Sequence, residues 1–478
     1  MFTRIKEEEA PHLSLEGKIG RKLDHYRKFN PIYNAFIPSS VNEDKIWEKT
    51  KRSVAKYSQN TPRPLEGLLI SIKDNICVKD TRTTAGSKIL SNFDSTYEST
   101  VTERLWKAGA IYMGKTNMDE FGMGSATLTS YYGESSNPYN TDYVCGGSSG
   151  GSAISVAKNM CYASIGTDTG GSIRQPAAFC GIVGLKPTYG RCSRWGVIAY
   201  ASSFDTVGVM AESVRDTALI LETIAGDDLD DSTSSNIPVR FYSKYVDKDI
   251  KGLRIGVIKS LSFEDTQFGK KEKDRIQNLL SQFAHAGCVI KEVEIPHIQH
   301  SLPIYYILAC AEASSNLARY DGVKYGLRVP GEDYHALVTN TRSEGFGDEV
   351  KKRILGGTFV LSSGYYDAYY TKASQVRNLL KQETKSVFEE VDVLFSPVTP
   401  SYPFTKESYK NQSVEEKYRQ DQFTVFSNLV GIPALSIPLK LKNEDTFPFS
   451  FQLMGKWFDE MTLFQLGHFF QTQLLSTV

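Results

Sequence analysis

The stretch from Cys145 to Gly184 (CGGSSGGSAISVAKNMCYASIGTDTGGSIRQPAAFCGIVG) constrains the fold most, because it contains two glycine–serine turns. The first turn covers residues 146–151 and the second residues 170–172. Glycine is used where the backbone takes a positive φ or approaches another group closely. The alternative is that the stretch is a flexible Gly/Ser linker. Core-like residues such as Val156 and Ile165 lie between the two turns, and a linker would not contain them. The stretch therefore indicates a site where backbone N–H groups and serine hydroxyls face a small substrate.

The composition is that of an ordinary soluble globular protein. Of its 478 residues, 40% are hydrophobic and 23% charged. Lys+Arg and Asp+Glu both number 55, so no overall field favours nucleic acid or an anionic membrane. No apolar run approaches the roughly 20 residues of a membrane span. We expect no membrane contact, and we expect any nucleic acid to be held mainly by a partner.

Alternating strand and helix patterns predict an α/β fold with one main domain. Predicted strands end at Lys73 and cover Ala110 to Met113, Cys161 to Gly166, Arg254 to Ile258, Val289 to Ile295, Val391 to Phe395 and Ala434 to Leu439. Predicted helices cover 17–57 with a break at Asn30-Pro31, 100–108, 152–158, 268–286, 415–429 and 458–474. We expect an N-terminal helical segment, residues 1–60, followed by a single domain, residues 61–478.

The seven cysteines are odd in number and form no C-x-x-C pair, which favours a reducing compartment. The N-terminus is acidic at Glu7, Glu8 and Glu9. It therefore resembles neither a secretory signal nor an intact mitochondrial transit peptide, which avoids acidic residues.

No histidine lies between residues 26 and 284, so neither glycine turn has one nearby in sequence. A Ser-His-Asp triad through space stays open, but nothing suggests it. Lys73, at the end of an apolar strand, is a candidate base, since burial holds a lysine neutral by lowering its pKa. An exposed lysine at a strand end is the alternative. His297 and His300 lack partners at metal-ligand spacing, so we expect no metal site.

Residues 109–116 (GAIYMGKT) match the phosphate-loop pattern G-x-x-x-x-G-K-[ST]. That loop follows a strand and opens a helix, whereas here a helix precedes the motif and the predicted strand lies inside it. Tyr112 and Met113 are also bulky for a loop whose backbone amides wrap a phosphate. We therefore predict that this match is not a nucleotide site.

Three runs carry a family resemblance: Lys73-Asp74-Asn75, GGSSGGS at 146–152 and GTDTGGSIRQPAAFCGIVGLKPTYGR at 166–191. They resemble the amidase signature family, and the resemblance covers about residue 60 to the end. It implies the amidase signature fold, an α/β fold with a mixed central β-sheet covered by helices on both faces. The signature core would span about residues 65–215.

The resemblance also implies the roles of the reacting groups. Ser172 resembles the nucleophile, Ser148 the bridging serine that follows a cis peptide bond, and Lys73 the base. The oxyanion would be bound by backbone N–H groups of four consecutive residues, Thr169, Gly170, Gly171 and Ser172. Ser149 and Asp168 would support the turns by hydrogen bonds.

The second half resembles one branch of the family, the glutaminase subunits of tRNA-dependent amidotransferases. The branch-like stretches are Ala311 to Gly326, Glu349 to Tyr370 and Tyr418 to Pro438. Glutamine specificity would reside in residues 300–478. Arg353 resembles the clamp on the substrate carboxylate, Asp421 the partner of its ammonium group, and Tyr305 a further carboxylate contact, although the register leaves Tyr306 open.

This branch hydrolyses glutamine and supplies ammonia for converting Glu-tRNA(Gln) to Gln-tRNA(Gln). The resemblance implies two partners in a hetero-oligomer, the B subunit of the amidotransferase together with a small third subunit, and it implies that the partner binds most of the tRNA. It implies no cofactor on this chain, with ATP and Mg²⁺ on the partner. The short region before Pro64 favours a mitochondrial protein, with a bacterial cytoplasmic one as the alternative. The other functions considered are a stand-alone amidase of the same fold and a non-catalytic scaffold.

Overall fold

The structure is a computed structural model, and it describes residues 14–261, 266–439 and 447–475 of the chain. The prediction about the acidic N-terminus falls on residues 1–13, which lie outside the described residues.

A ten-stranded sheet runs through the centre of the molecule in the order β2-β1-β3-β5-β4-β9-β10-β8-β6-β7. The strands are β1 (Leu69–Lys73), β2 (Ile111–Thr116), β3 (Ala163–Asp168), β4 (Val183–Lys186), β5 (Thr206–Ala211), β6 (Arg254–Ile258), β7 (Val289–Val293), β8 (Val393–Pro397), β9 (Ala434–Leu439) and β10 (Phe449–Gly455). β1 pairs parallel with β2 and β3, and β6 with β7 and β8, whereas the central pairs from β3 to β8 are antiparallel. The predicted α/β fold with a mixed sheet is confirmed.

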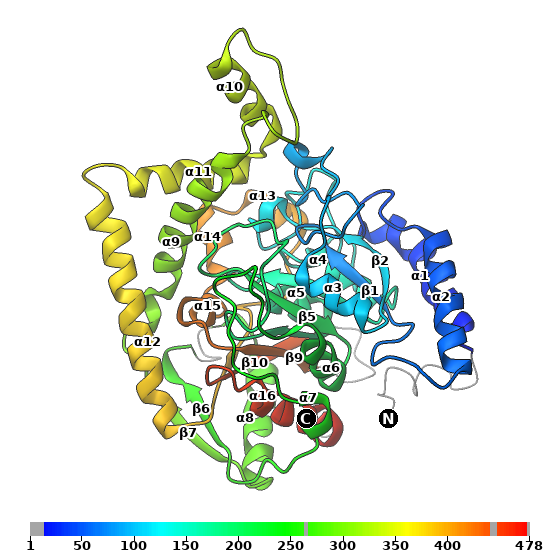
Figure 1. Cartoon of the computed structure of the whole chain (residues 1–478). Helices are drawn as coiled ribbons and strands as arrows, with labels where there is room; N and C mark the ends of the chain where they lie inside the picture. Colours follow the sequence, from blue (N-terminus) through cyan, green and yellow to red (C-terminus); the bar gives the residue numbers. More distant parts are fainter. Residues whose placement is uncertain (1–13, 262–265, 440–446, 476–478) are drawn as a thin grey trace.

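Helices surround this sheet (Figure 1). They are α1 (Leu15–Tyr33), α2 (Glu43–Ser58), α3 (Thr100–Lys107), α4 (Gly150–Ala157), α5 (Arg174–Cys180), α6 (Val214–Ile224), α7 (Tyr242–Tyr245), α8 (Lys270–His285), α9 (Ser301–Asn316), α10 (Tyr334–Gly345), α11 (Asp348–Leu361), α12 (Lys372–Glu390), α13 (Lys406–Asn411), α14 (Val414–Arg419), α15 (Val425–Val430) and α16 (Glu460–Phe469). α1 and α2 lie side by side beyond the β2 edge, α9, α11 and α12 lie on the opposite side, and α10 projects from the body.

Two predicted helices differ from the observed ones. The break expected at Asn30-Pro31 is wrong, because α1 continues through Pro31 to Tyr33 and ends at Asn34, whose φ is 49°. Proline at position 31 removes the backbone donor to the carbonyl of Arg27, and only Ile32 and Tyr33 follow it in the helix. The helix expected over 415–429 is also wrong, since a turn at residues 420–424 separates α14 from α15. This turn carries Asp421.

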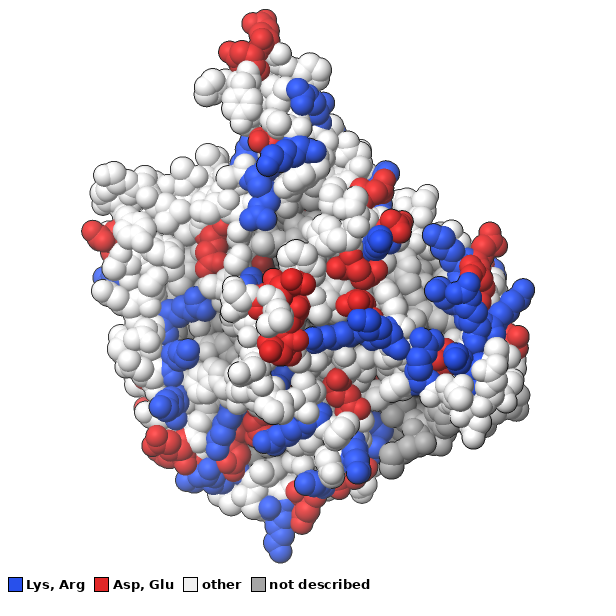
Figure 2. All heavy atoms as spheres, in the orientation of Figure 1, with Lys and Arg blue, Asp and Glu red and all other residues white. Residues whose placement is uncertain are grey.

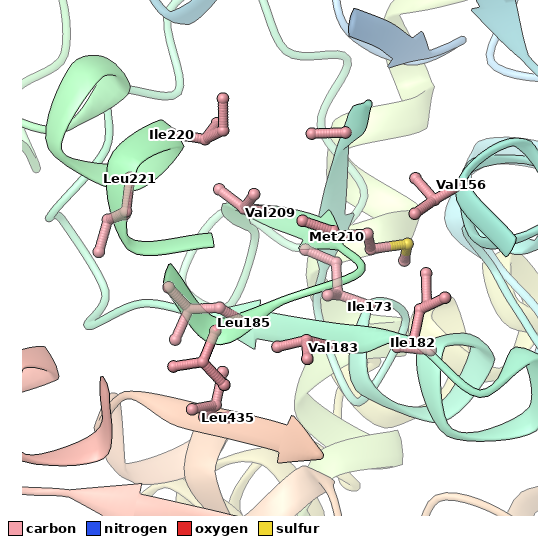
Figure 3. Close-up of a cluster of buried hydrophobic side chains, with 14 of the residues drawn as sticks. Val156, Ile173, Ile182, Val183, Leu185, Val209, Met210, Ile220, Leu221 and Leu435 are labelled. Carbon is pink, nitrogen blue, oxygen red and sulfur yellow. The ribbon is translucent and has the colours of Figure 1, made fainter. Parts of the chain in front are cut away.

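Two groups of buried apolar side chains hold the fold together. The first lies around the sheet and includes Val183, Leu185, Val209 and Leu435, which converge from adjacent strands (Figure 3). Ile173 follows the second glycine turn and packs into this core, so its burial holds the turn against the sheet. The second group lies among α9, α11, α12 and α15 and forms the frame of the C-terminal half.

Candidate active site

Lys73 ends β1 as a fully buried side chain. Its Nζ lies 2.7 Å from the Ser148 hydroxyl oxygen and 3.0 Å from the Thr167 hydroxyl oxygen. Burial lowers the pKa of Lys73 to about 7, although buried carboxylates, Asp119 foremost, oppose this effect. The amine is therefore available in its neutral form near neutral pH, as a general base requires.

Two other buried lysines show that a lowered pKa alone does not make a base. Lys115 donates to the carbonyl of Ile76 and to the Thr83 hydroxyl, 2.9 Å away. Lys186 donates to the carbonyl of Ile432 at 2.6 Å. Burial lowers the pKa of both lysines. Among the described residues Lys186 meets only carbonyls, which have no proton to give, and Lys115 meets a threonine hydroxyl that lies outside both glycine turns. Lys73, by contrast, meets a serine hydroxyl.

The phosphate-loop match at residues 109–116 does not form a phosphate loop. α3 precedes it, and β2 occupies Ile111 to Thr116, so Lys115 lies buried within a strand. The predicted strand inside the motif is confirmed.

The first glycine turn presents Ser148 to Lys73. The peptide bond between Gly147 and Ser148 is cis, as the resemblance implies. The Gln175 side chain accepts from Gly147 N–H at 2.8 Å, and the Ser148 carbonyl accepts from Asp119 N–H at 3.2 Å. A Cβ on Gly147 would collide with the Asp119 carboxylate. Asp119 is thus the close neighbour that requires glycine before Ser148.

Asp119 in turn organises the loop that follows it. Its carboxylate accepts backbone N–H groups from four consecutive residues, 126–129, and the Thr129 hydroxyl at 3.0 Å. No local sequence pattern marks Asp119, because its role depends on the geometry of the loop.

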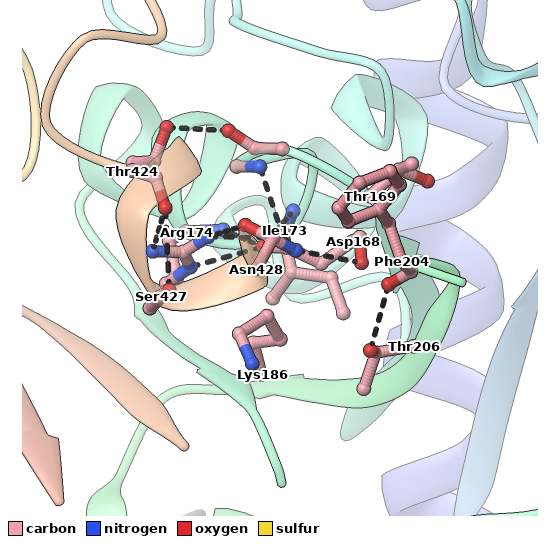
Figure 4. Close-up of polar contacts among 12 residues, drawn as sticks. Asp168, Thr169, Ile173, Arg174, Lys186, Phe204, Thr206, Thr424, Ser427 and Asn428 are labelled. Carbon is pink, nitrogen blue, oxygen red and sulfur yellow. Dashed lines mark hydrogen bonds and ion pairs between the residues drawn. The ribbon is translucent and has the colours of Figure 1, made fainter. Parts of the chain in front are cut away.

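The second glycine turn is clamped by a buried ion pair (Figure 4). Asp168 receives two hydrogen bonds from the Arg174 guanidinium, at 3.0 and 3.1 Å, and one from Gly171 N–H at 2.9 Å. Burial alone would raise the pKa of Asp168, but Arg174 lowers it to about 2. Arg174 also donates to the Thr424 carbonyl and to Asn428 on α15. The carboxylate therefore stays charged and fixes the turn against the C-terminal half.

Ser172 lies on this turn and is 8% exposed. Its carbonyl accepts from Ser149 N–H at 3.1 Å, so the two turns touch directly. Among the described residues, the Ser172 hydroxyl makes no hydrogen bond to Ser148. Catalytic hydrogen bonds of this kind tighten when substrate binds. The hydroxyl is free to turn toward substrate.

Asp168 takes one of the four predicted oxyanion donors at this turn. Because Gly171 N–H is bound by Asp168, the N–H groups of Thr169, Gly170 and Ser172 are the candidates. A Cβ on Gly170 would collide with the Tyr305 ring, and one on Gly171 with the Thr424 side chain. Both glycines are thus required by close approach.

Arg353 is a buried arginine and not a solvated helix charge, whereas its neighbour Lys352 on α11 is exposed. Its Nη1 donates to the Tyr200 hydroxyl at 2.6 Å, and its Nε donates to Glu349 at 2.8 Å. Nη2 has no acceptor among the described residues. The guanidinium carbon lies 5.3 Å from the Tyr306 ring centre. One edge of the guanidinium is therefore left for a ligand anion.

Asp421 lies in the turn between α14 and α15, close to this arginine. It accepts from the Tyr306 hydroxyl at 2.8 Å, and burial raises its pKa to about 7. Thr424, in the same turn, donates to the Gly170 carbonyl at 2.5 Å. The structure thus brings Asp421 next to the second glycine turn. Tyr305 borders that turn, while Tyr306 lies between the two charges.

Glu120 links the two halves of the site and was not foreseen from the sequence. Its carboxylate accepts from the Ser87 hydroxyl and, at 2.8 Å, from Gly347 N–H. Gly347 is the N-cap of α11, six positions before Arg353. Burial raises the pKa of Glu120 to about 7. Because Asp119 holds the Ser148 turn, residues 119–120 connect Ser148 with α11.

In the described ranges, no three His, Cys, Asp or Glu side chains lie close enough together to hold a metal ion. All seven cysteines are free and buried. No helix of the described chain has the length and apolar character needed to cross a membrane.

A family model described as Amidase matches residues 20–464, nearly the whole chain. The chain belongs to the amidase family. The resemblance of the glycine–serine turns to that family is confirmed.

Within the amidase family, the chain is similar to proteins named as the A subunit of glutamyl-tRNA(Gln) amidotransferase. The one from Synechococcus sp. is 48% identical over 94% of this chain and 92% of its own length. The one from Parvibaculum lavamentivorans is 48% identical over 97% of this chain and 93% of its own. The crystal structure of the Thermotoga maritima protein of the same name matches with a TM-score of 0.79 at 34% identity, covering 98% of this chain and 95% of that one.

The amidase fold is shared with enzymes of other names. The peptide amidase from Stenotrophomonas maltophilia matches with a TM-score of 0.81 at 25% identity over 98% of this chain and 96% of that one.

Proposed function

We propose that this chain is the glutaminase subunit of a tRNA-dependent amidotransferase. It hydrolyses glutamine and supplies ammonia for converting Glu-tRNA(Gln) to Gln-tRNA(Gln). The names of the relatives at 48% identity support this reading. The observation that carries it is the placement of buried Arg353 and half-buried Asp421 on either side of Tyr306, with Asp421 in the turn that contacts Gly170. A free amino acid needs one cation and one anion for its two charged groups.

In this mechanism the neutral Lys73 amine removes the proton of Ser148 while Ser148 removes that of Ser172. The Ser172 oxygen attacks the carboxamide carbon of glutamine, since a serine hydroxyl is a weak nucleophile until a base takes its proton. The N–H groups at Thr169, Gly170 and Ser172 stabilise the developing oxyanion, and one such donor is worth about 3–4 kcal/mol of barrier.

Collapse of the tetrahedral intermediate breaks the carbon–nitrogen bond. The proton held by Lys73 returns through Ser148 to the departing nitrogen, which leaves as ammonia. The glutamyl ester on Ser172 is then hydrolysed when water gives its proton to the same relay, which releases glutamate and restores the serine. No cofactor is needed for these steps.

The assembly around this chain is part of the proposal. The B subunit of the amidotransferase, together with a small third subunit, would bind tRNA and use ATP and Mg²⁺ to activate the glutamyl group. The zero net charge of this chain fits a protein that leaves most tRNA binding to its partners. The mitochondrial location stays a prediction from the sequence resemblance.

A stand-alone amidase is the second candidate, favoured by the fold shared with the peptide amidase. The two candidates are separated by measuring ammonia release from glutamine, from glutamine blocked at its α-amino and α-carboxyl groups, and from an apolar acyl amide. A glutaminase subunit hydrolyses free glutamine with the highest kcat/KM, and co-purified partners raise that rate. Preference for the blocked or acyl amides would overturn the proposal.

A further inference from the structure

A groove of about 1240 Å³ lies between α2 and the loop that follows β1. One wall is α2, the other is formed by residues 78–82, and residues 109–112 contribute to the floor. The groove exceeds the roughly 300–1,000 Å³ of ordinary small-molecule pockets. Neither Lys73, Ser148 nor Ser172 lines it.

The α2 wall carries a stripe of cations. Lys45, Lys49, Arg52 and Lys56 recur at helical spacing and all line the groove. The other face of α2 packs inward through buried residues such as Ile46. Figure 2 shows Lys and Arg side chains gathered over α1 and α2, with acidic residues among them.

The groove is basic although the chain is neutral. Its lining contains eight Lys or Arg residues and three acidic ones, against 55 of each in the whole chain. Arg82 pairs with Asp94, and Arg63 with Glu66. Among the described residues, no carboxylate pairs with the lysines of the groove walls, which are Lys45, Lys49, Lys56 and Lys79. These ammonium groups are available for a ligand with several negative charges.

The floor is apolar and aromatic. Val78, Trp106, Ile111 and Tyr112 contribute to it. The cation stripe rises about 1.5 Å per residue, so it extends about 16 Å, the length of about five residues of extended peptide. A peptide with mixed acidic and apolar side chains satisfies both the walls and the floor. RNA offers phosphates to the walls but few aliphatic groups to the floor.

We propose that this groove binds an extended acidic segment of a partner subunit. The proposal rests on the proposed function for the existence of that partner. Acidic side chains of the segment pair with the wall lysines, and its apolar side chains pack on the half-buried rings of Trp106 and Tyr112. The groove thereby anchors the partner to the N-terminal helices and leaves the reacting groups untouched.

Zero-length carbodiimide cross-linking of the purified complex, with partner subunits co-expressed, tests the occupant. We expect amide links from Lys45, Lys49, Lys56 or Lys79 to Asp or Glu residues of a partner, read by mass spectrometry without tRNA present. Links to Glu7, Glu8 or Glu9 of this chain would overturn the proposal, because its own N-terminus would then fill the groove. Absence of links at all four lysines would also overturn it.

Amine labelling of the same lysines separates protein from RNA. In the tRNA-free complex, labelling of the groove lysines is expected to fall several-fold relative to the isolated chain. Exposed lysines elsewhere, Lys381 and Lys385 on α12, are the control and should label equally. Protection that occurs only after tRNA is added would contradict a peptide occupant.

Charge reversal measures the contribution of the stripe. The triple variant K45E/K49E/K56E should bind the partner at least about tenfold more weakly at low salt, with a smaller difference at high salt. The matched variant K291E/K381E/K385E should bind normally. Changing the cross-linked acidic residues of the partner to lysine should restore binding to the triple variant.

Ammonia release from glutamine keeps the two proposals distinguishable. The isolated triple variant retains the basal glutaminase activity of the isolated chain, since the groove lies outside the site. If the chain hydrolyses glutamine but no partner binds in the groove, the docking proposal is refuted and the proposed glutaminase function stands. If the partner binds through the groove but the chain does not hydrolyse glutamine, the proposed glutaminase function is refuted and the docking proposal stands.

Discussion

The reacting half and the recognition half of the site are built in different ways. The two glycine–serine turns are continuous runs whose backbone is fixed by buried neighbours such as Asp119 and the Asp168–Arg174 pair. The recognition half instead combines Arg353 from α11, Tyr306 from α9 and Asp421 from a turn. Under the proposed function, reaction geometry is preset by local backbone, whereas glutamine binding depends on packing between distant segments. Substitutions in the first half should affect kcat, and substitutions in the second half should affect KM.

Ser172→Ala should give the largest effect. Ammonia release from glutamine is expected to fall at least about 10⁴-fold, the range seen when a serine nucleophile is removed. The melting temperature should change little, because among the described residues the Ser172 hydroxyl holds no partner. Ser149→Ala is the control: its hydroxyl donates to the Thr167 carbonyl at 3.1 Å, so its loss should weaken the turn but spare the nucleophile. Near-normal turnover by Ser172→Ala would refute the nucleophile.

Lys73→Met should lower kcat about 10³-fold, as expected for loss of a general base. Lys186→Met is the matched variant, since Lys186 is an equally buried lysine with a pKa of about 7. That variant should reduce thermal stability, because the carbonyl of Ile432 loses its donor, but kcat should change far less. Equal losses of kcat in both variants would show that activity depends on a buried lysine in general and not on the contact between Lys73 and Ser148.

Arg353→Ala should raise the KM for glutamine about 10- to 100-fold, since one charge-assisted hydrogen bond contributes about 1.5–3 kcal/mol. The kcat at saturating glutamine should change less. Lys352→Ala, one residue earlier and exposed, should leave KM unaltered. Initial-rate kinetics of the two variants measure both constants. A normal KM in Arg353→Ala would contradict the proposal that Arg353 binds the carboxylate of glutamine.

Glu120→Gln tests the link between the two halves. The amide weakens the contact with Gly347 N–H, which anchors the start of α11, so KM should rise about threefold to tenfold with a small change in kcat. Glu344→Gln, an exposed residue on α10, is the control. A change in kcat alone would place the role of Glu120 in the serine turns instead.

The contrast also explains what the sequence predicts well. Glycine runs and a strand-ending lysine are local signals, so Lys73, Ser148 and Ser172 were singled out before the structure. Residues 119–120 lie in a loop with no periodicity, and their roles arise only when the chain returns near them. The same holds for Tyr200, which binds Arg353 from 153 positions away. The turn at Asp421 was missed because its sequence continues a helical pattern that tertiary contacts to Gly170 interrupt.

The pH dependence of kcat at saturating glutamine tests the central claim most directly. A base must be deprotonated to act, and burial lowers the pKa of Lys73 to about 7. The account predicts that kcat falls about tenfold per pH unit below about pH 7 and reaches a plateau above it. Saturating substrate keeps the binding role of Asp421 out of the measurement. A kcat that is flat from about pH 6 to 9, or that rises only near the ordinary pKa of lysine, would contradict the neutral lysine base.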